Sequence, residues 1–118
     1  MKGEFISEID GADAGPWTPL LKRMEQVFLE LGFRVREIDG TRYMAYRENF
    51  CKITPLRYPN GAVKFVLEWA DSRETAEKHL LEDGDLYSAD LPETELLQQL
   101  RADLIREQKK LPSLDGRG

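Results

Sequence analysis

The residue types that most often carry out chemistry are scarce in this chain. It has one histidine, His79, and one cysteine, Cys51. A catalytic histidine needs a partner held at hydrogen-bond distance, and His79 has no serine or cysteine as a near neighbour in the sequence. A zinc site built from nitrogen and sulfur ligands needs several such residues. The sequence therefore predicts that neither residue is catalytic, and it predicts no metal site and no cofactor.

An acidic stretch at residues 82–85, with Asp90 beyond it, raises the question of a calcium site. Calcium loops of the EF-hand type need oxygen ligands at alternate positions and a glutamate at the twelfth, and this stretch lacks that spacing. We therefore expect a solvated loop at the end of a helix. The glycines also lack the spacing of a phosphate-binding loop. The absence of these motifs disfavours an enzyme. A small enzyme that uses carboxylates and arginines stays an alternative.

Basic residues concentrate in the middle of the chain. Residues 33–69 hold seven basic side chains against four acidic ones, a net charge of +3, whereas the whole chain has −5. The same region has the strongest strand composition, and Ala62–Trp69 is its best segment. Charge sorted in this way indicates where a partner could dock.

A hairpin centred on Asp39-Gly40 sets the register of this region. The two residues favour a type I′ turn, which needs positive φ at both positions. Ile38 then pairs with Thr41, and the alternation of side chains separates two faces. The face predicted to enter the core carries Phe33, Val35, Met44 and Tyr46, and further along the sheet Cys51, Val63, Phe65, Leu67 and Trp69.

The opposite face is the candidate binding site. Its predicted members combine cations with aromatic rings: Arg34, Arg36, Tyr43, Arg47, Phe50, Lys52 and Lys64. Arginines interleaved with aromatics suit an acidic peptide or the bases of RNA. A plain solvated sheet face, or a face covered by the chain's own acidic helices, stays open as an alternative.

Helical periodicity flanks the strands. Apolar residues at three- and four-residue spacing predict a helix over about 19–31, a short helix over about 72–81 and a long helix over about 93–110. The fold class is therefore predicted as α+β, with a four-stranded antiparallel meander over about 33–69. We expect a single domain over 1–111 and a disordered tail over 112–118.

Bulk composition narrows the classes of function. Hydrophobic residues make up 41% and charged residues 33%, and the pI is near 5.0. An acidic chain does not attract phosphates in general, so nucleic acid is the less favoured partner. A lone cysteine excludes an intramolecular disulfide and favours the cytoplasm, and no stretch has the ~20 apolar residues of a membrane span.

The leading hypothesis is a small cytoplasmic interaction domain without enzymatic activity. It would bind a protein or peptide. An acidic partner would fit the basic sheet face. Binding of RNA or single-stranded nucleic acid through the same face is the first alternative. Homodimer formation is also compatible with the sequence.

Overall fold

The computed structural model describes residues 6–9 and 15–111 of the chain. Its fold is α+β, as predicted, with an antiparallel sheet, an N-terminal helix and a long C-terminal helix. The helices are α1 (Thr18–Glu30), α2 (Arg73–Glu77) and α3 (Glu93–Lys110), and a short 3-10 turn, Gly15–Trp17, precedes α1. The strands are β1 (Ser7–Glu8), β2 (Arg34–Ile38), β3 (Thr41–Tyr46), β4 (Asn49–Arg57), β5 (Val63–Ala70) and β6 (Glu82–Ser88).

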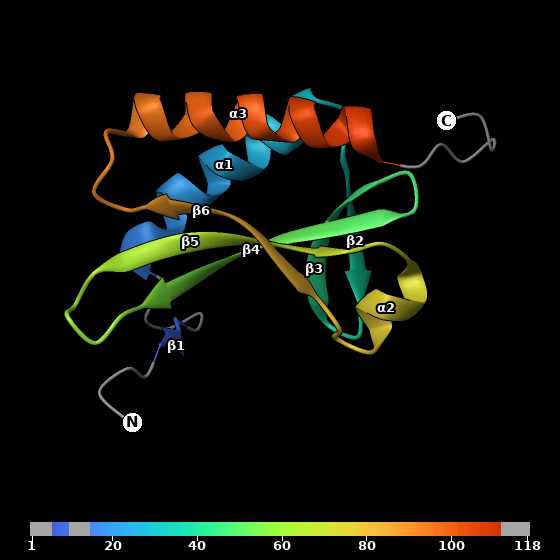
Figure 1. Ribbon diagram of the computed structural model, residues 1–118, viewed down its shortest axis with the longest axis horizontal. Coiled ribbons are helices and arrows are strands. Elements are labelled where there is room, and N and C mark those ends of the chain that lie inside the picture. Colours follow the sequence, from blue (N-terminus) through green and yellow to red (C-terminus); the bar gives the residue numbers. More distant parts are fainter. Residues whose placement is uncertain (1–5, 10–14, 112–118) are drawn as a thin grey trace.

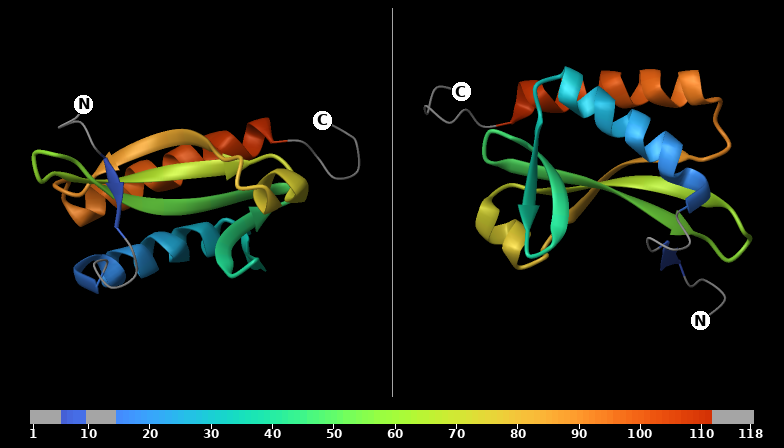
Figure 2. Two further views of the ribbon diagram at one scale, coloured as in Figure 1. Left: turned by 90° about the horizontal axis from the view of Figure 1, so that it is seen from below. Right: turned by 180° about the vertical axis from the view of Figure 1, so that it is seen from behind.

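Strands β2 to β6 follow one another across the sheet in chain order, and β1 pairs with β4 beyond the end of β3. Helices α1 and α3 lie together over one face, which we call the inner face (Figures 1 and 2). The opposite face, called the outer face, carries the short helix α2 at one end (Figure 1). The predicted four-stranded meander is thus part of a larger sheet.

The first hairpin has the register that the sequence predicted. Ile38 pairs with Thr41 and Val35 with Met44. Asp39 and Gly40 have φ values of 51° and 80°, which are the positive values of the expected turn. The side chains of β2 and β3 therefore divide between the two faces as expected.

Replacing Gly40 with valine is expected to lower the free energy of unfolding by more than ~1 kcal/mol, because a β-branched residue resists positive φ. A Cβ at Gly40 would meet no atom within 4 Å, so the cost isolates backbone strain. Gly15 is the matched control, since it has equal space and no positive φ. Urea denaturation measures both valine variants, and equal costs would contradict this account of the turn.

Strand β4 continues through Pro55 to Arg57, although proline has no N–H to donate to a strand ladder. The carbonyl of Pro55 accepts a hydrogen bond from the Ile9 amide at 2.9 Å. In an antiparallel ladder, the N–H and C=O of one residue point to the same neighbour. The missing N–H of Pro55 therefore points toward β1, and no bond to β5 is lost.

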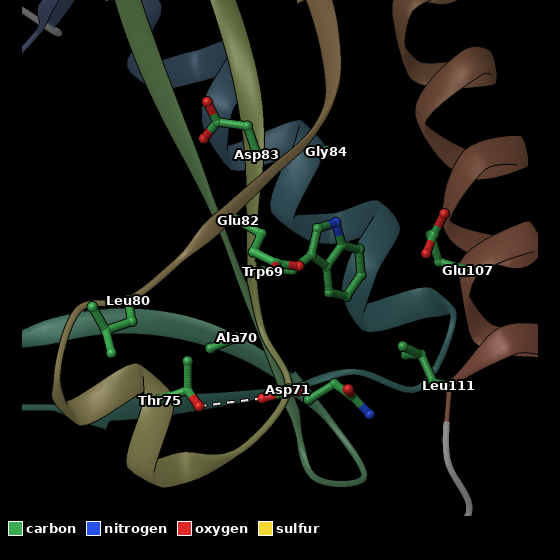
Figure 3. A pocket seen from close by; sticks show the side chains of 11 residues that line it. Trp69, Ala70, Asp71, Thr75, Leu80, Glu82, Asp83, Gly84, Glu107 and Leu111 are labelled. Atoms are coloured by element: carbon green, nitrogen blue, oxygen red, sulfur yellow. Dashed lines mark hydrogen bonds between the residues drawn. The ribbon is translucent and has the colours of Figure 1, made fainter.

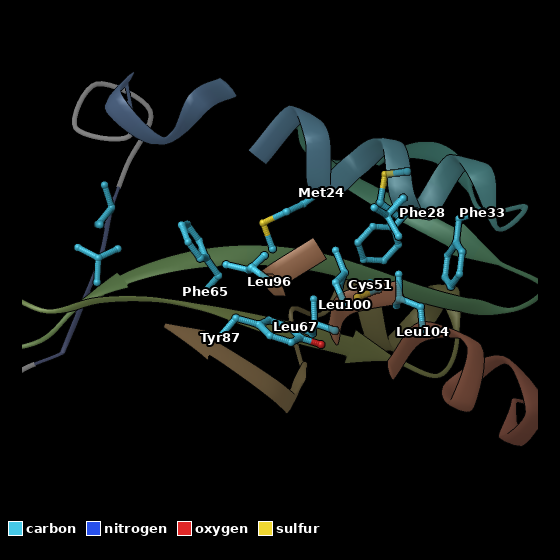
Figure 4. Packing of buried hydrophobic residues seen from close by; sticks show 14 residues of the cluster. Met24, Phe28, Phe33, Cys51, Phe65, Leu67, Tyr87, Leu96, Leu100 and Leu104 are labelled. Carbon is cyan, nitrogen blue, oxygen red and sulfur yellow. The ribbon is translucent and has the colours of Figure 1, made fainter. Parts of the chain in front are cut away.

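The principal core lies between the inner face and the two long helices (Figure 4). Met24 and Phe28 from α1 meet Leu96, Leu100 and Leu104 from α3 there, all fully buried. The predicted strand residues Val63, Phe65 and Leu67 are also buried, while Trp69 is only half-buried at its edge. Burying these apolar surfaces provides the main driving force for folding.

A second, smaller core lies on the outer face beneath α2. Its buried members are Ile38, Tyr43, Ala45, Phe50, Ala70 and Ala76. Ser72 caps α2 by accepting a hydrogen bond from the Thr75 amide at 3.1 Å. The predicted helix over 72–81 is shorter than expected, because the chain turns at His79, with φ of 57°, and enters β6.

Candidate functional site

The outer face keeps part of the predicted basic surface. Arg34 and Arg36 are exposed on the edge strand β2, and Lys52 and Lys64 are half-buried on β4 and β5. Arg36 makes one hydrogen bond, from its guanidinium to the carbonyl of Val35 at 3.1 Å. These four cations are not contiguous, because a second core and the middle of the sheet separate them.

Tyr43 and Phe50 do not lie on an open surface, contrary to the sequence-based expectation. Tyr43 is 0% exposed and Phe50 is 7% exposed. Their rings pack edge to face with centroids 6.0 Å apart, and the Tyr43 hydroxyl donates to the Ala76 carbonyl at 3.5 Å. Burial, and then the charge of Glu68, raises the pKa of Tyr43. Helix α2 has buried the two rings that were predicted to contact a partner.

Arg47 does not lie on the outer face with the other predicted binding residues. It lies in the turn before Asn49, with φ of 57°, rather than on a strand. Its guanidinium lies 5.1 Å from the centroid of the Tyr46 ring and donates to the Leu111 carbonyl at 3.4 Å. The turn between β3 and β4 consists of Arg47 and Glu48, and this position moves Arg47 off the outer face.

Ion pairs are distributed unevenly between helices and sheet. Most helix cations are paired with acids of the fold: Arg23 with Glu93, Arg73 with Glu77, Lys78 with Glu74, Arg101 with Glu30, Arg106 with Asp85, and Lys110 with Glu107. On the sheet, Arg42 forms a two-pronged pair with Glu25, and this hydrogen bond and charge raise the pKa of Arg42. Among the described residues, Arg34, Arg36, Lys52 and Lys64 make no ion pair. Arg42 is therefore neutralised within the fold, whereas no described residue neutralises these four cations.

Two of these sheet cations, Lys52 and Lys64, have a charged or aromatic residue close by. Lys52 stands opposite Glu68 in the register of β4 and β5, but the Glu68 carboxylate accepts a hydrogen bond from Thr54 instead. The ammonium of Lys64 lies 4.9 Å from the centroid of the Tyr58 ring. Cation–π contacts of this kind are weak at exposed sites, so Lys64 can still meet an anion.

A groove of about 540 Å³ opens at the end of the sheet near α2 and the end of α3. Its lining residues come from four parts of the chain: Asn49, Trp69, Ala70, Asp71, Thr75, Leu80, Glu82, Asp83, Gly84, Glu107 and Leu111. In Figure 3 the indole of Trp69 lies between the side chains of Glu82 and Glu107. The groove therefore combines an aromatic ring with carboxylates.

Strand β6 forms one wall of this groove, and the sequence had predicted a solvated loop there. Its acidic first half has poor strand propensity, but it pairs with β5 from Glu82 opposite Trp69 to Ser88 opposite Lys64. Gly84 makes the pairing possible, since a Cβ there would lie 3.0 Å from two atoms of the Trp69 indole. No alternation in residues 82–85 signals this strand.

His79 and Cys51 lie in different environments. His79 is exposed after α2, and Cys51 is 0% exposed in the principal core. Burial raises the pKa of the Cys51 thiol well above its ordinary value, which suppresses the reactive thiolate. Within residues 6–9 and 15–111, no group of three or more potential ligands could hold a metal ion. None of the described helices has the length and apolar character needed to cross a membrane.

Tyr87 joins β6 to α3 through a short hydrogen bond. Its hydroxyl donates to Asp103 Oδ2 at 2.5 Å, and the Tyr87 side chain is 2% exposed. Burial, followed by the hydrogen bond and charge of Asp103, raises the pKa of Tyr87 far above its ordinary value of 10.0. The folded protein therefore keeps this proton at pH values where the unfolded chain loses it.

Alkaline pH is expected to weaken the fold through Tyr87. The stabilising contribution is complete below the unfolded pKa near 10 and is lost as the pH rises above it, by up to about 1.4 kcal/mol per pH unit. Urea denaturation between pH 9 and 11 should show a smaller decline for Tyr87→Phe than for the wild type. Tyr58→Phe, at a half-buried site, is the control, and equal slopes for all three proteins would contradict the prediction.

No protein-family model matches this chain, and no curated protein or solved structure matches it.

Proposed function

We propose that this protein is an interaction module that binds an acidic protein or peptide through the cations of its outer sheet face. One observation carries the proposal. Helix α2 lies over this face, yet its glutamates pair with its own cations, Glu74 with Lys78 and Glu77 with Arg73, each at 2.9 Å. The carboxylates of α2 thus do not pair with Arg34 or Arg36.

One exposed apolar side chain lies on the outer face, on β6, which is the opposite edge of the sheet from Arg34 and Arg36. Leu86 is 46% exposed and stands opposite Val66 on the outer face. Protein interfaces combine an apolar centre with a polar rim, and arginine is enriched in them. The alternative of RNA binding loses its main support, because Tyr43 and Phe50 are buried and cannot stack on bases. An acidic peptide needs no such stacking.

The test compares two charge-matched double variants. Arg34→Gln/Arg36→Gln removes the exposed cations of β2, whereas Lys22→Gln/Lys109→Gln removes two helix cations with no ion pair among the described residues. The probe is a capped twelve-residue peptide of aspartate and glutamate, titrated into ¹⁵N-labelled protein at low and at moderate salt. We expect amide shifts on β2 and β4 that weaken with salt.

Arg34→Gln/Arg36→Gln should reduce binding of the peptide, and Lys22→Gln/Lys109→Gln should leave it near the wild-type value. Equal losses in the two variants would mean a response to net charge alone and would refute the site. A parallel titration with oligouridine separates the alternatives, because shifts on β2 and β4 with oligouridine alone would support nucleic-acid binding instead.

A further inference from the structure

The groove beside Trp69 is lined by a side-chain amide whose oxygen makes no hydrogen bond with the described residues. Asn49 is 2% exposed and lines the groove. Its Nδ2 donates to the Tyr46 carbonyl at 3.4 Å, but its Oδ1 accepts no hydrogen bond from the described residues. Among the described residues, no side-chain nitrogen or oxygen that is itself buried lacks a hydrogen-bond partner, so this oxygen is reached by solvent in the groove. A ligand that donates a hydrogen bond would complete this site.

The Trp69 indole also lines the groove. The ring is half-buried, and its Nε1–H donates to no described residue. Tryptophan N–H groups usually find a partner when the ring is packed. Gly84 holds β6 close beneath the ring, leaving room for no side chain there. The indole is therefore fixed at the groove with an aromatic surface and an unused donor.

Carboxylates give the groove its charge. Glu82 is exposed, stands opposite Trp69 in the register, and makes no ion pair with the described residues. Glu107 lies across the indole and contacts Lys110 and Arg106, each at 3.3 Å. Those pairs are between neighbours on one exposed helix surface, where ion pairs contribute little. A cation entering the groove would compete with them easily.

Among the other polar groups at the groove, Asp83 has no partner within the described residues, whereas two groups do. Asp71 accepts a hydrogen bond from the Thr75 hydroxyl at 3.2 Å. Arg47 donates to the carbonyl of Leu111 and so places a positive charge beside Leu111. The unpaired negative charge is thus on the β6 side, at Glu82 opposite Trp69 and at Asp83.

We propose that this groove binds an arginine side chain presented by a protein partner. A guanidinium is planar, stacks on aromatic rings and donates several hydrogen bonds in a fixed fork. It can lie against the Trp69 indole while donating to Glu82 and to Asn49 Oδ1. A carbonyl of the partner's backbone can accept the indole N–H. A lysine ammonium would satisfy the charge but would lack the planar stacking surface.

This inference is independent of the acidic partner proposed for the outer face. The groove is lined by β6 and the end of α3 and prefers a cation, whereas the outer-face cations prefer an anion. Arg34→Gln/Arg36→Gln should therefore leave arginine binding unchanged. A negative result for the acidic peptide would therefore not count against arginine binding in the groove, and the reverse also holds.

The test uses the indole N–H signal of Trp69 as its reporter. The chain has two tryptophans, so ¹⁵N spectra contain two indole signals, and Trp69→Phe identifies the one from the groove. The probes are capped tripeptides, acetyl-Gly-Arg-Gly-amide and the same peptide with citrulline, which is an uncharged isostere of arginine. We expect the arginine peptide to shift the Trp69 signal in a saturable manner, with no shift at Trp17 and little effect from citrulline.

Glu82→Gln should weaken binding of the arginine peptide about tenfold, which is the loss of one charge-assisted hydrogen bond. Glu95→Gln is the matched control, because it removes the same charge from α3 at a distance of about 18 Å along the helix from Glu107. Gly84→Ala should also impair binding, since its Cβ would displace the indole. Equal shifts with arginine and citrulline, no shift with arginine, or equal affinities of Glu82→Gln and Glu95→Gln would each overturn the proposal.

Discussion

Replacing Phe65 with alanine is expected to lower the free energy of unfolding by about 3–5 kcal/mol, as deletion of a buried aromatic ring does. Phe65 is 0% exposed in the middle of β5. Its ring packs edge to face on Trp17 with centroids 5.8 Å apart, so it joins the sheet to the segment that leads into α1. The cavity left by the ring cannot close without moving both elements. Urea denaturation monitored by circular dichroism measures the loss.

Leu86→Ala is the control for this experiment. Leu86 lies on β6, the neighbouring strand, but it is 46% exposed on the outer face. Surface substitutions usually change stability by no more than about 0.5 kcal/mol. If Leu86→Ala costs as much as Phe65→Ala, the assignment of inner and outer faces is wrong.

The sequence predicted the parts of the fold that depend on local signals. Asp39-Gly40 specifies its turn through backbone conformation alone, and a two-residue turn fixes the register of both strands. The period-two alternation of Val63, Phe65 and Leu67 then places them on the core face. The apolar periodicities of α1 and α3 are equally local. These signals need no knowledge of distant contacts.

Strand β6 could not be predicted because its structure is imposed by distant contacts. The residues Asp83-Gly84-Asp85 favour a loop by composition. They form a strand because β5 offers an unpaired edge and because Gly84 fits under the Trp69 indole. Tyr87 then fixes the strand to α3 through Asp103. Tertiary pairing overrides weak propensity in such a case.

The candidate binding face shows the same limit. Alternation correctly assigned Tyr43 and Phe50 to the outer face, but it could not predict what covers that face. The cover is α2, a helix of five residues whose position depends on contacts with Tyr43 and Ala70. The prediction of exposed cations on this face is correct for Arg34 and Arg36. Both are exposed and make no ion pair with the described residues.

Replacing Tyr43 with alanine is the second substitution from which we expect a large effect, a loss of about 3 kcal/mol or more in the free energy of unfolding. Tyr43 is 0% exposed and is the largest side chain of the outer-face core. Its ring supports both Phe50 and α2, the latter through Ala76. Helix α2 is too short to be stable alone, so it should lose its ordered position. Hydrogen exchange at the amides of Ala76 and Lys78 should accelerate accordingly.

Tyr43→Phe separates the ring from the hydroxyl. The hydroxyl lies 3.5 Å from the Ala76 carbonyl, which is at the outer limit of a hydrogen bond, so this variant should lose less than about 1 kcal/mol. It should also bind the acidic peptide as the wild type does, because the proposed contacts come from Arg34 and Arg36 and not from the buried ring. A loss of peptide binding in Tyr43→Phe with stability retained would instead place the phenol in the interface, and α2 would then have to move aside when the partner binds.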